Sequence, residues 1–212
     1  MNKWFILPGM GASAAMYNAL RHKIDFEINF INWPDYHGEK AYSEVARRVI
    51  LDHDISDGDV VGGSSLGGMV ALEIAEIVNP SGILLLGSAI TSNEVQNLLS
   101  LLAPLASLTP ISVVQVLVGK NKNLVSSMFA DTNPEFIRAM CAYLNSWKGY
   151  RGSRDKVYRL HGKNDLVIPC PSSGCDIIED AGHLIAMTHV QETADFLKRT
   201  KEKLTSRSSP AL

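Results

Sequence analysis

The stretch Gly-Ser-Ser-Leu-Gly at residues 63–67 constrains the fold of this chain more than any other segment. It follows a short, mainly apolar run at residues 59–61 and precedes a helical pattern at residues 69–78, so it lies where a strand would turn sharply into a helix. Glycines two positions before and after Ser65 let the strand and the helix approach without a Cβ clash. The same turn puts Ser65 at a helix N-terminus, where free backbone N–H groups favour negative charge. Because a flexible glycine-rich turn has the same composition, the rest of the sequence must decide between the two interpretations.

Short apolar segments alternate with helical patterns on both sides of this turn. We expect strands at residues 3–7, 26–32, 59–65, 83–86, 156–160 and 176–178, and helices at residues 14–23, 41–51, 69–78 and 184–204. This alternation predicts an α/β protein with a doubly wound, mostly parallel six-stranded sheet. If the first strand lies between the second and the third, the glycine-rich loop at residues 8–13 shares one crevice with Ser65.

A long stretch with helical periodicity separates the fourth and fifth expected strands. We expect residues 91–154 to form a helical lid inserted into a single domain of residues 1–212, with a disordered tail at residues 205–212. Residues 95–119 carry no charge, which also fits a membrane span, but prolines and polar residues within them favour a lid. The last lid helix is expected to begin with Asn133 as its N-cap.

Composition and charge narrow the classes of partner. A net charge of −2 with 20% charged residues provides no basic surface for nucleic acid and no polybasic segment for a membrane. A small molecule is therefore the expected partner. The apolar run at residues 4–7 is broken by Pro8 and is too short for a secretory signal.

Three cysteines, Cys141, Cys170 and Cys175, are odd in number and not densely spaced. This favours free thiols in a reducing compartment, and we expect a cytoplasmic protein. Cys170 and Cys175 are also conceivable as metal ligands, but no second cysteine pair or His-x-x-x-His motif accompanies them. We therefore expect neither a metal nor an organic cofactor.

Two later stretches carry side chains suited to act with Ser65. A serine hydroxyl is a weak nucleophile unless a base accepts its proton, and that base needs an acceptor to orient it. Asp165 lies in the loop after the strand at residues 156–160, and His183 lies in the loop after the strand at residues 176–178. The chain order Ser65, Asp165, His183 is the order expected for such triads on this kind of sheet.

Other polar residues near these loops have simpler interpretations. Ser64 lacks the glycines at both flanking positions that Ser65 has. Asp155 precedes its strand, and Asp180 is too close to His183 in sequence to be its partner. His161 stands at the end of a strand and is expected to be structural.

With these motifs the chain resembles the α/β-hydrolase family over nearly its whole length. The resemblance is carried by residues 7–11, 63–68, 161–169 and 181–183, which are similar to the family's oxyanion loop, nucleophile elbow, acid loop and histidine loop. Three departures are visible. Pro8 stands where the family usually has histidine, the two leading antiparallel strands are absent, and residues 170–175 leave no room for the customary helix.

The resemblance implies a role for each site residue. Ser65 would be the nucleophile, His183 the general base and later acid, and Asp165 the carboxylate that orients it. The oxyanion hole would use the backbone N–H groups of Met10 and Leu66.

The same resemblance implies a serine hydrolase that cleaves a carboxylic ester or thioester of a small apolar acyl substrate through an acyl-enzyme. Two alternatives stay open: an acyltransferase or lyase on the same fold, and a non-catalytic ligand-binding module with a vestigial triad. Acyl chain length and oligomeric state are not specified by the sequence.

Overall fold

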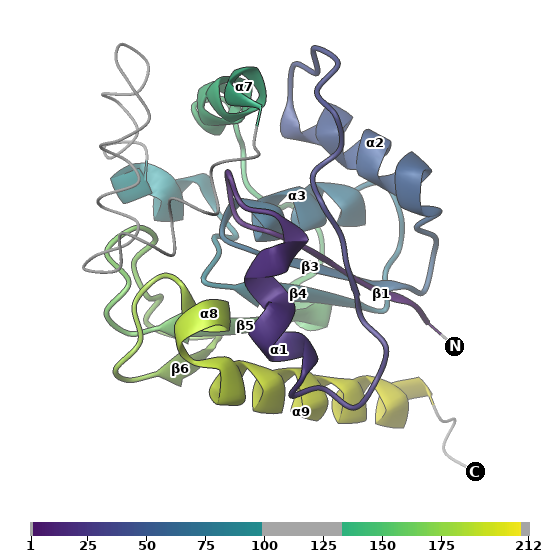
Figure 1. Ribbon diagram of the computed structural model, residues 1–212, viewed down its shortest axis with the longest axis vertical. Coiled ribbons are helices and arrows are strands. Elements are labelled where there is room, and N and C mark those ends of the chain that lie inside the picture. Colours follow the sequence, from purple (N-terminus) through teal and green to yellow (C-terminus); the bar gives the residue numbers. More distant parts are fainter. Residues whose placement is uncertain (1, 99–132, 209–212) are drawn as a thin grey trace.

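The computed structural model describes residues 2–98 and 133–208. Six strands form one sheet in which each neighbouring pair is parallel, in the order β2-β1-β3-β4-β5-β6. The α/β class and the parallel six-stranded sheet are thus confirmed (Figure 1). The strands are β1 (Trp4–Leu7), β2 (Asn29–Phe30), β3 (Val60–Ser64), β4 (Gly82–Leu86), β5 (Val157–Gly162) and β6 (Asp176–Ile178).

The strand order reverses beside β1, since the chain runs from β1 to β2 at the sheet edge and returns on the other side as β3. The first strand therefore lies between the second and the third, as the crevice argument required. Leu7 at the end of β1 is paired with Gly63 near the end of β3. The loops that follow these two strands leave the sheet side by side, at the place where α/β sheets bind ligands.

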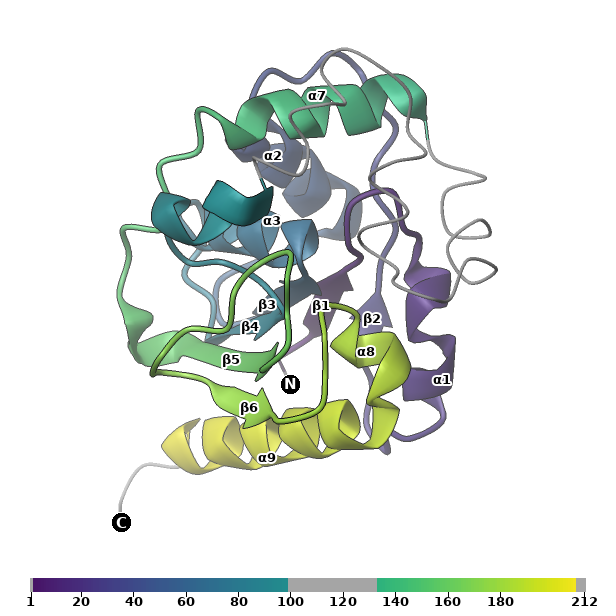
Figure 2. The same ribbon diagram turned by 90° about the vertical axis from the view of Figure 1, so that its left-hand side faces the viewer.

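Helices cover both faces of the sheet (Figures 1 and 2). One face carries α2 (Tyr42–His53), α3 (Leu66–Ala75) and α7 (Pro134–Leu144); the other carries η1 (Ala14–Tyr17), α1 (Asn18–Arg21), α8 (Ile185–Thr188) and α9 (Val190–Ser208). Along β4, Ile83 and Leu85 pack on the first face, and Leu84 and Leu86 pack on the second. This alternation explains why the strand reads as a continuous apolar run.

Two elements near the N-terminus are shorter than the sequence predicts. The helix expected at residues 14–23 consists of the 3-10 turn η1 and one turn of α-helix, α1. The strand expected at residues 26–32 is reduced to β2, which pairs only with Phe5 and Ile6 of β1. Phe26 instead packs edge-on against Trp4, with ring centroids 5.0 Å apart.

The closing helix expected at residues 184–204 is divided into α8 and α9. His189, between them, has φ −126° and ψ 59°, and its carbonyl accepts hydrogen bonds from the backbone N–H and the hydroxyl of Thr193. The α9 helix continues through residues 205–208, which the sequence assigned to a disordered tail. Thr205 donates to the Lys201 carbonyl and Arg207 donates to the Asp155 carbonyl, which extends the helix; residues 209–212 lie outside the described residues.

Most of the predicted lid, residues 99–132, lies outside the described residues. Its described ends contain η2 (Ser92–Val95) and α7, and η4 (Arg154–Lys156) leads into β5. The α7 helix begins as predicted, with the Asn133 side chain accepting from the backbone N–H of Glu135. Among the described helices, none has both the length and the apolar character needed to cross a membrane.

Candidate active site

Ser65 occupies the sharp turn between β3 and α3. Its backbone has φ 51° and ψ −119°, a region that side-chain-bearing residues rarely adopt. The turn is also crowded: a Cβ added at Gly63 would lie 2.3 Å from the carbonyl carbon of Gly67, and one added at Gly67 would lie 2.3 Å from the Pro8 carbonyl oxygen. The two glycines are therefore required by close backbone approach.

Three side chains that are distant in sequence meet at this turn. His183 Nε2 lies 2.9 Å from the Ser65 hydroxyl oxygen, and His183 Nδ1 lies 2.8 Å from Asp165 Oδ2. An imidazole that donates from Nδ1 to the carboxylate leaves Nε2 free to accept the serine proton. The structure thus brings together the three residues that the sequence predicts to form a triad.

Asp165 is held by hydrogen bonds on both carboxylate oxygens. Oδ1 accepts from the backbone N–H groups of Val167 and Ile168, both at 2.9 Å, while Oδ2 faces His183. Burial alone would raise the pKa of this carboxyl. Hydrogen bonds from His161, His183 and Ile168, together with the charge of His183, outweigh burial and hold the pKa well below its usual range. Asp165 is therefore an ionised, fully buried acceptor for His183.

The loop after β1 lies directly against Ser65. A Cβ added at Gly9 would lie 3.9 Å from the Ser65 Cβ, and the indole N–H of Trp33 donates to the Gly9 carbonyl at 3.0 Å. Leu66 is the first residue of α3, so its N–H has no partner within the helix. Within the described part of the chain, neither Leu66 nor Met10 donates its backbone N–H to a carbonyl.

Comparisons with known proteins identify the fold in which this geometry occurs. No protein-family model matches the sequence, and no curated protein matches it. Among solved structures, an esterase from Thermogutta terrifontis has a TM-score of 0.73 at 16% identity, covering 96% of this chain and 90% of its own. A hydrolase from Oleispira antarctica has a TM-score of 0.73 at 13% identity, covering 95% of this chain and 91% of its own. The N-acyl homoserine lactonase AidH, in complex with N-butanoyl homoserine, has a TM-score of 0.70 at 17% identity, covering 97% of this chain and 90% of its own. The chain has the α/β-hydrolase fold. At these identities the likeness establishes the architecture alone.

His161 is a contact of the acid loop that the sequence did not reveal. It is fully buried at the end of β5, and its Nε2 lies 2.8 Å from the Ile168 carbonyl and 3.3 Å from Asp165 Oδ2. Because a carbonyl oxygen only accepts, Nε2 carries a proton and serves both acceptors. The sequence indicated a structural histidine, and its position four residues before Asp165 was the available signal for this contact.

Polar contacts beneath the α/β-hydrolase elbow fix its backbone. The Tyr17 hydroxyl donates to the Leu7 carbonyl at 2.7 Å and lies 2.8 Å from the Ser64 hydroxyl. The Ser64 hydroxyl therefore has a hydrogen-bond partner in the interior of the protein. The Ser88 hydroxyl donates to the Ser65 carbonyl at 2.6 Å. Arg159 in turn donates to the Ser88 carbonyl and pairs with Glu94. Arg159 was missed because nothing in the apolar pattern of β5 marks a buried guanidinium.

The rival carboxylates have other partners. Asp155 accepts from Ser153, Asp176 pairs with Arg199 at 3.0 Å, and Asp180 lies 3.4 Å from His189. In residues 2–98 and 133–208, no group of three or more His, Cys, Asp or Glu side chains is arranged to hold a metal ion.

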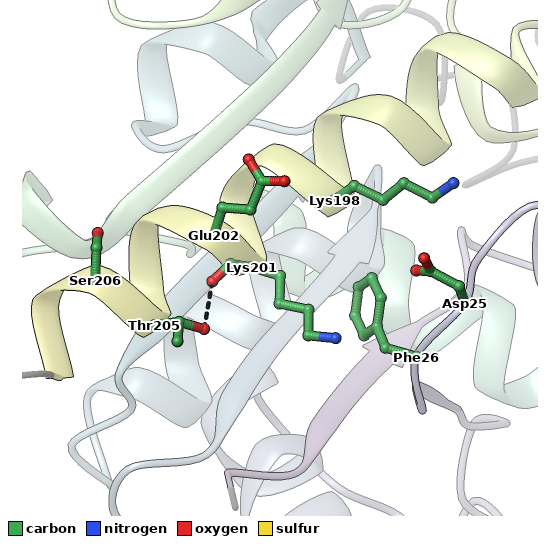
Figure 3. Close-up of a pocket in the computed structure, with 7 residues that line it drawn as sticks. All are labelled: Asp25, Phe26, Lys198, Lys201, Glu202, Thr205 and Ser206. Atoms are coloured by element: carbon green, nitrogen blue, oxygen red, sulfur yellow. Dashed lines mark hydrogen bonds between the residues drawn. The ribbon is translucent and has the colours of Figure 1, made fainter.

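A separate hollow of about 480 Å³ lies between α9 and the segment before β2 (Figure 3). Its lining includes Asp25, Phe26, Lys201 and Glu202, and none of the triad residues. The Lys201 ammonium lies 4.3 Å from the centre of the Phe26 ring. Figure 3 shows the Lys201 side chain extending from α9 toward Phe26. The hollow therefore carries charges of both signs and is distinct from the site at Ser65.

Proposed function

We propose that this protein is a serine hydrolase that cleaves a carboxylic ester or thioester of a small apolar acyl substrate. The observation that carries the proposal is the hydrogen-bonded series from Ser65 through His183 to Asp165, at the head of α3. The shared fold with proteins described as an esterase, a hydrolase and a lactonase supports it.

In the proposed mechanism, His183 Nε2 takes the proton of the Ser65 hydroxyl while the Ser65 oxygen attacks the acyl carbonyl. The developing oxyanion is stabilised by the backbone N–H groups of Leu66 and Met10, with support from the α3 dipole. His183 then gives the proton to the departing alcohol or thiol, which leaves an acyl-enzyme. Water attacks this intermediate with His183 as base, and Ser65 is regenerated. Asp165 stays ionised throughout and stabilises the imidazolium.

An apolar acyl group is supported by the side chains that surround the first loop. The Met10 sulfur lies 3.4 Å from the Cys141 sulfur of α7, so this helix covers the proposed oxyanion loop. Phe136, also of α7, packs against Trp33 with ring centroids 5.5 Å apart. The contacts that α7 makes with the first loop and with Trp33 thus come from sulfur and aromatic groups rather than from charged ones.

The test is labelling of the purified protein with a fluorophosphonate, followed by peptide mapping and by hydrolysis of p-nitrophenyl esters of graded chain length. We expect one label on the peptide that contains Ser65, lost in Ser65→Ala but retained in Ser64→Ala. The ester series then gives the preferred acyl length. Absence of label from folded protein would reject the hydrolase and favour a ligand-binding module instead.

A further inference from the structure

Two thiols lie in the loop that joins the acid of the proposed triad to the edge strand β6. Cys170 and Cys175 are both half-buried and free. Their sulfur atoms approach the same backbone oxygen, that of Pro171, at 3.7 Å and 3.9 Å respectively. The loop therefore folds back on itself and gathers both thiols around one carbonyl.

The backbone of this loop favours their approach. Pro171 restricts the chain next to Cys170, and Gly174 has φ 76°, which turns the chain back immediately before Cys175. A Cβ added at Gly174 would meet no atom within 4 Å, and Ser172 and Ser173 are exposed. The turn thus stands in open space, where it can adjust without disturbing the core.

Cys170 also lies close enough to perturb the Cys175 thiol. Burial, together with interactions with Cys170, raises the pKa of the Cys175 thiol to about 11. Cys175 is therefore almost entirely protonated at neutral pH. Because the thiolate is the form that attacks a disulfide, Cys175 reacts slowly in its resting state. Cys175 is accordingly the thiol suited to the second, internal step of an exchange with an external disulfide.

We propose that Cys170 and Cys175 form a reversible disulfide by exchange with a low-molecular-weight disulfide such as glutathione disulfide. The Cys170 thiolate attacks one glutathione sulfur, forming a mixed disulfide and releasing one glutathione thiolate. Cys175, on losing its proton, attacks the Cys170 sulfur and releases the second glutathione. The protein loses two hydrogen atoms and one glutathione disulfide becomes two glutathione molecules, so the exchange is balanced.

This disulfide would tether the acid loop to β6, since Cys175 immediately precedes that strand. The disulfide would close a loop of residues 170–175. Val167 and Ile168, whose backbone N–H groups donate to Asp165, lie outside that loop. The proposal therefore does not depend on the function proposed for Ser65. It identifies a modification site at the edge of the sheet.

The experiment incubates the folded full chain in buffers of reduced and oxidised glutathione, quenches with iodoacetamide and measures intact mass and unreduced peptide maps. We expect a species that has lost two hydrogen atoms, carries one blocked thiol at Cys141 and contains a peptide linking Cys170 to Cys175. The equilibrium gives the effective concentration of the thiol pair. We expect it to be at least about tenfold higher in the folded chain than in urea, because the fold holds the two thiols together.

Single variants provide the controls. Cys170→Ser and Cys175→Ser should lose the internal disulfide, whereas Cys141→Ser should keep it. A folded chain that gives only mixed glutathione adducts would overturn the proposal. An effective concentration in the folded chain equal to or below that in urea would also overturn it, because the fold would then not favour the pair.

Discussion

At the scale of single residues, Asp165 shows how much of the site is built behind the three reacting side chains. One oxygen is fixed by two backbone N–H groups, and the other lies between His183 and His161. His161 Nε2 also donates to the Ile168 carbonyl. The same N–H therefore contacts both the Asp165 carboxylate and the backbone of the loop that contains Asp165. This makes His161 a positioning residue for the proposed triad.

We therefore expect His161→Leu to lower kcat about ten- to a hundredfold, because a hydrogen bond to a charged group contributes about 1.5–3 kcal/mol. His161→Gln keeps an N–H near the Nε2 position and should recover most of this loss, while KM stays similar in both variants. Ester hydrolysis gives kcat and KM, the rate of fluorophosphonate labelling reports Ser65 directly, and thermal unfolding reports folding. Equal losses in both variants, matched by equal destabilisation, would mean that His161 only fills space.

At the scale of elements, the turn between β3 and α3 depends on backbone contact with β1. Gly67→Ala would push a Cβ to 2.3 Å from the Pro8 carbonyl oxygen, which cannot rotate away. We expect it to lower the free energy of unfolding by about 1–3 kcal/mol and to displace the proposed oxyanion loop. Gly9→Ala is the matched control, since its Cβ would meet no atom nearer than 3.9 Å. Urea unfolding measures the free energy of unfolding of both variants. Equal values would mean that the approach of Gly67 to the Pro8 carbonyl does not require a glycine.

The α7 helix packs on the rest of the domain through one face of large side chains, Phe136, Met140 and Leu144. Phe136 is buried and packs against the rings of Trp33 and Tyr36. Because Trp33 donates to the Gly9 carbonyl, loosening α7 should also loosen the first loop.

Accordingly, Phe136→Ala should lower the free energy of unfolding by about 3–5 kcal/mol, the usual loss for a buried phenylalanine. Leu51→Ala on α2 is the control, because that side chain is 75% exposed and should change stability by less than about 0.5 kcal/mol. Chemical denaturation measures both. A Phe136 variant as stable as the Leu51 variant would show that α7 does not rest on this contact.

At the scale of the whole molecule, the sequence predicts most of the architecture because local patterns and topology agree. Alternating apolar segments and helices predicted the six strands, and the crossover rule predicted that they are parallel. The place of β1 between β2 and β3 was only a condition of the sequence argument, and the structure supplies it. Asp165 and His183 were predicted as partners of Ser65 from their places after the strands that became β5 and β6. By contrast, the contact of Arg159 with Ser88 arises only when β4 and β5 pack side by side, so no local pattern encodes it. For His161, the spacing of four residues to Asp165 was the only local signal of their contact. The break at His189 lies in its non-helical backbone conformation, φ −126° and ψ 59°, which helical periodicity does not report.

The stability of the whole molecule should carry the signature of Asp165 at acid pH. Its pKa is lower in the folded chain than in the unfolded chain, where an aspartate titrates near about 3.9. The ionised carboxylate therefore contributes stability that is fully present above that value and is lost as the pH falls toward the folded pKa. Burial raises the pKa of Glu73, so Glu73 changes stability with pH in the opposite direction. Because Glu73 is present in both proteins compared, its effect cancels in the difference. The difference in free energy of unfolding between the native sequence and Asp165→Asn, measured by urea titration from pH 5 downward, should be largest near about pH 5 and shrink below about pH 4. A difference that stays constant over this range would mean that the folded and unfolded pKa values of Asp165 are the same, contrary to the hydrogen bonds that surround it.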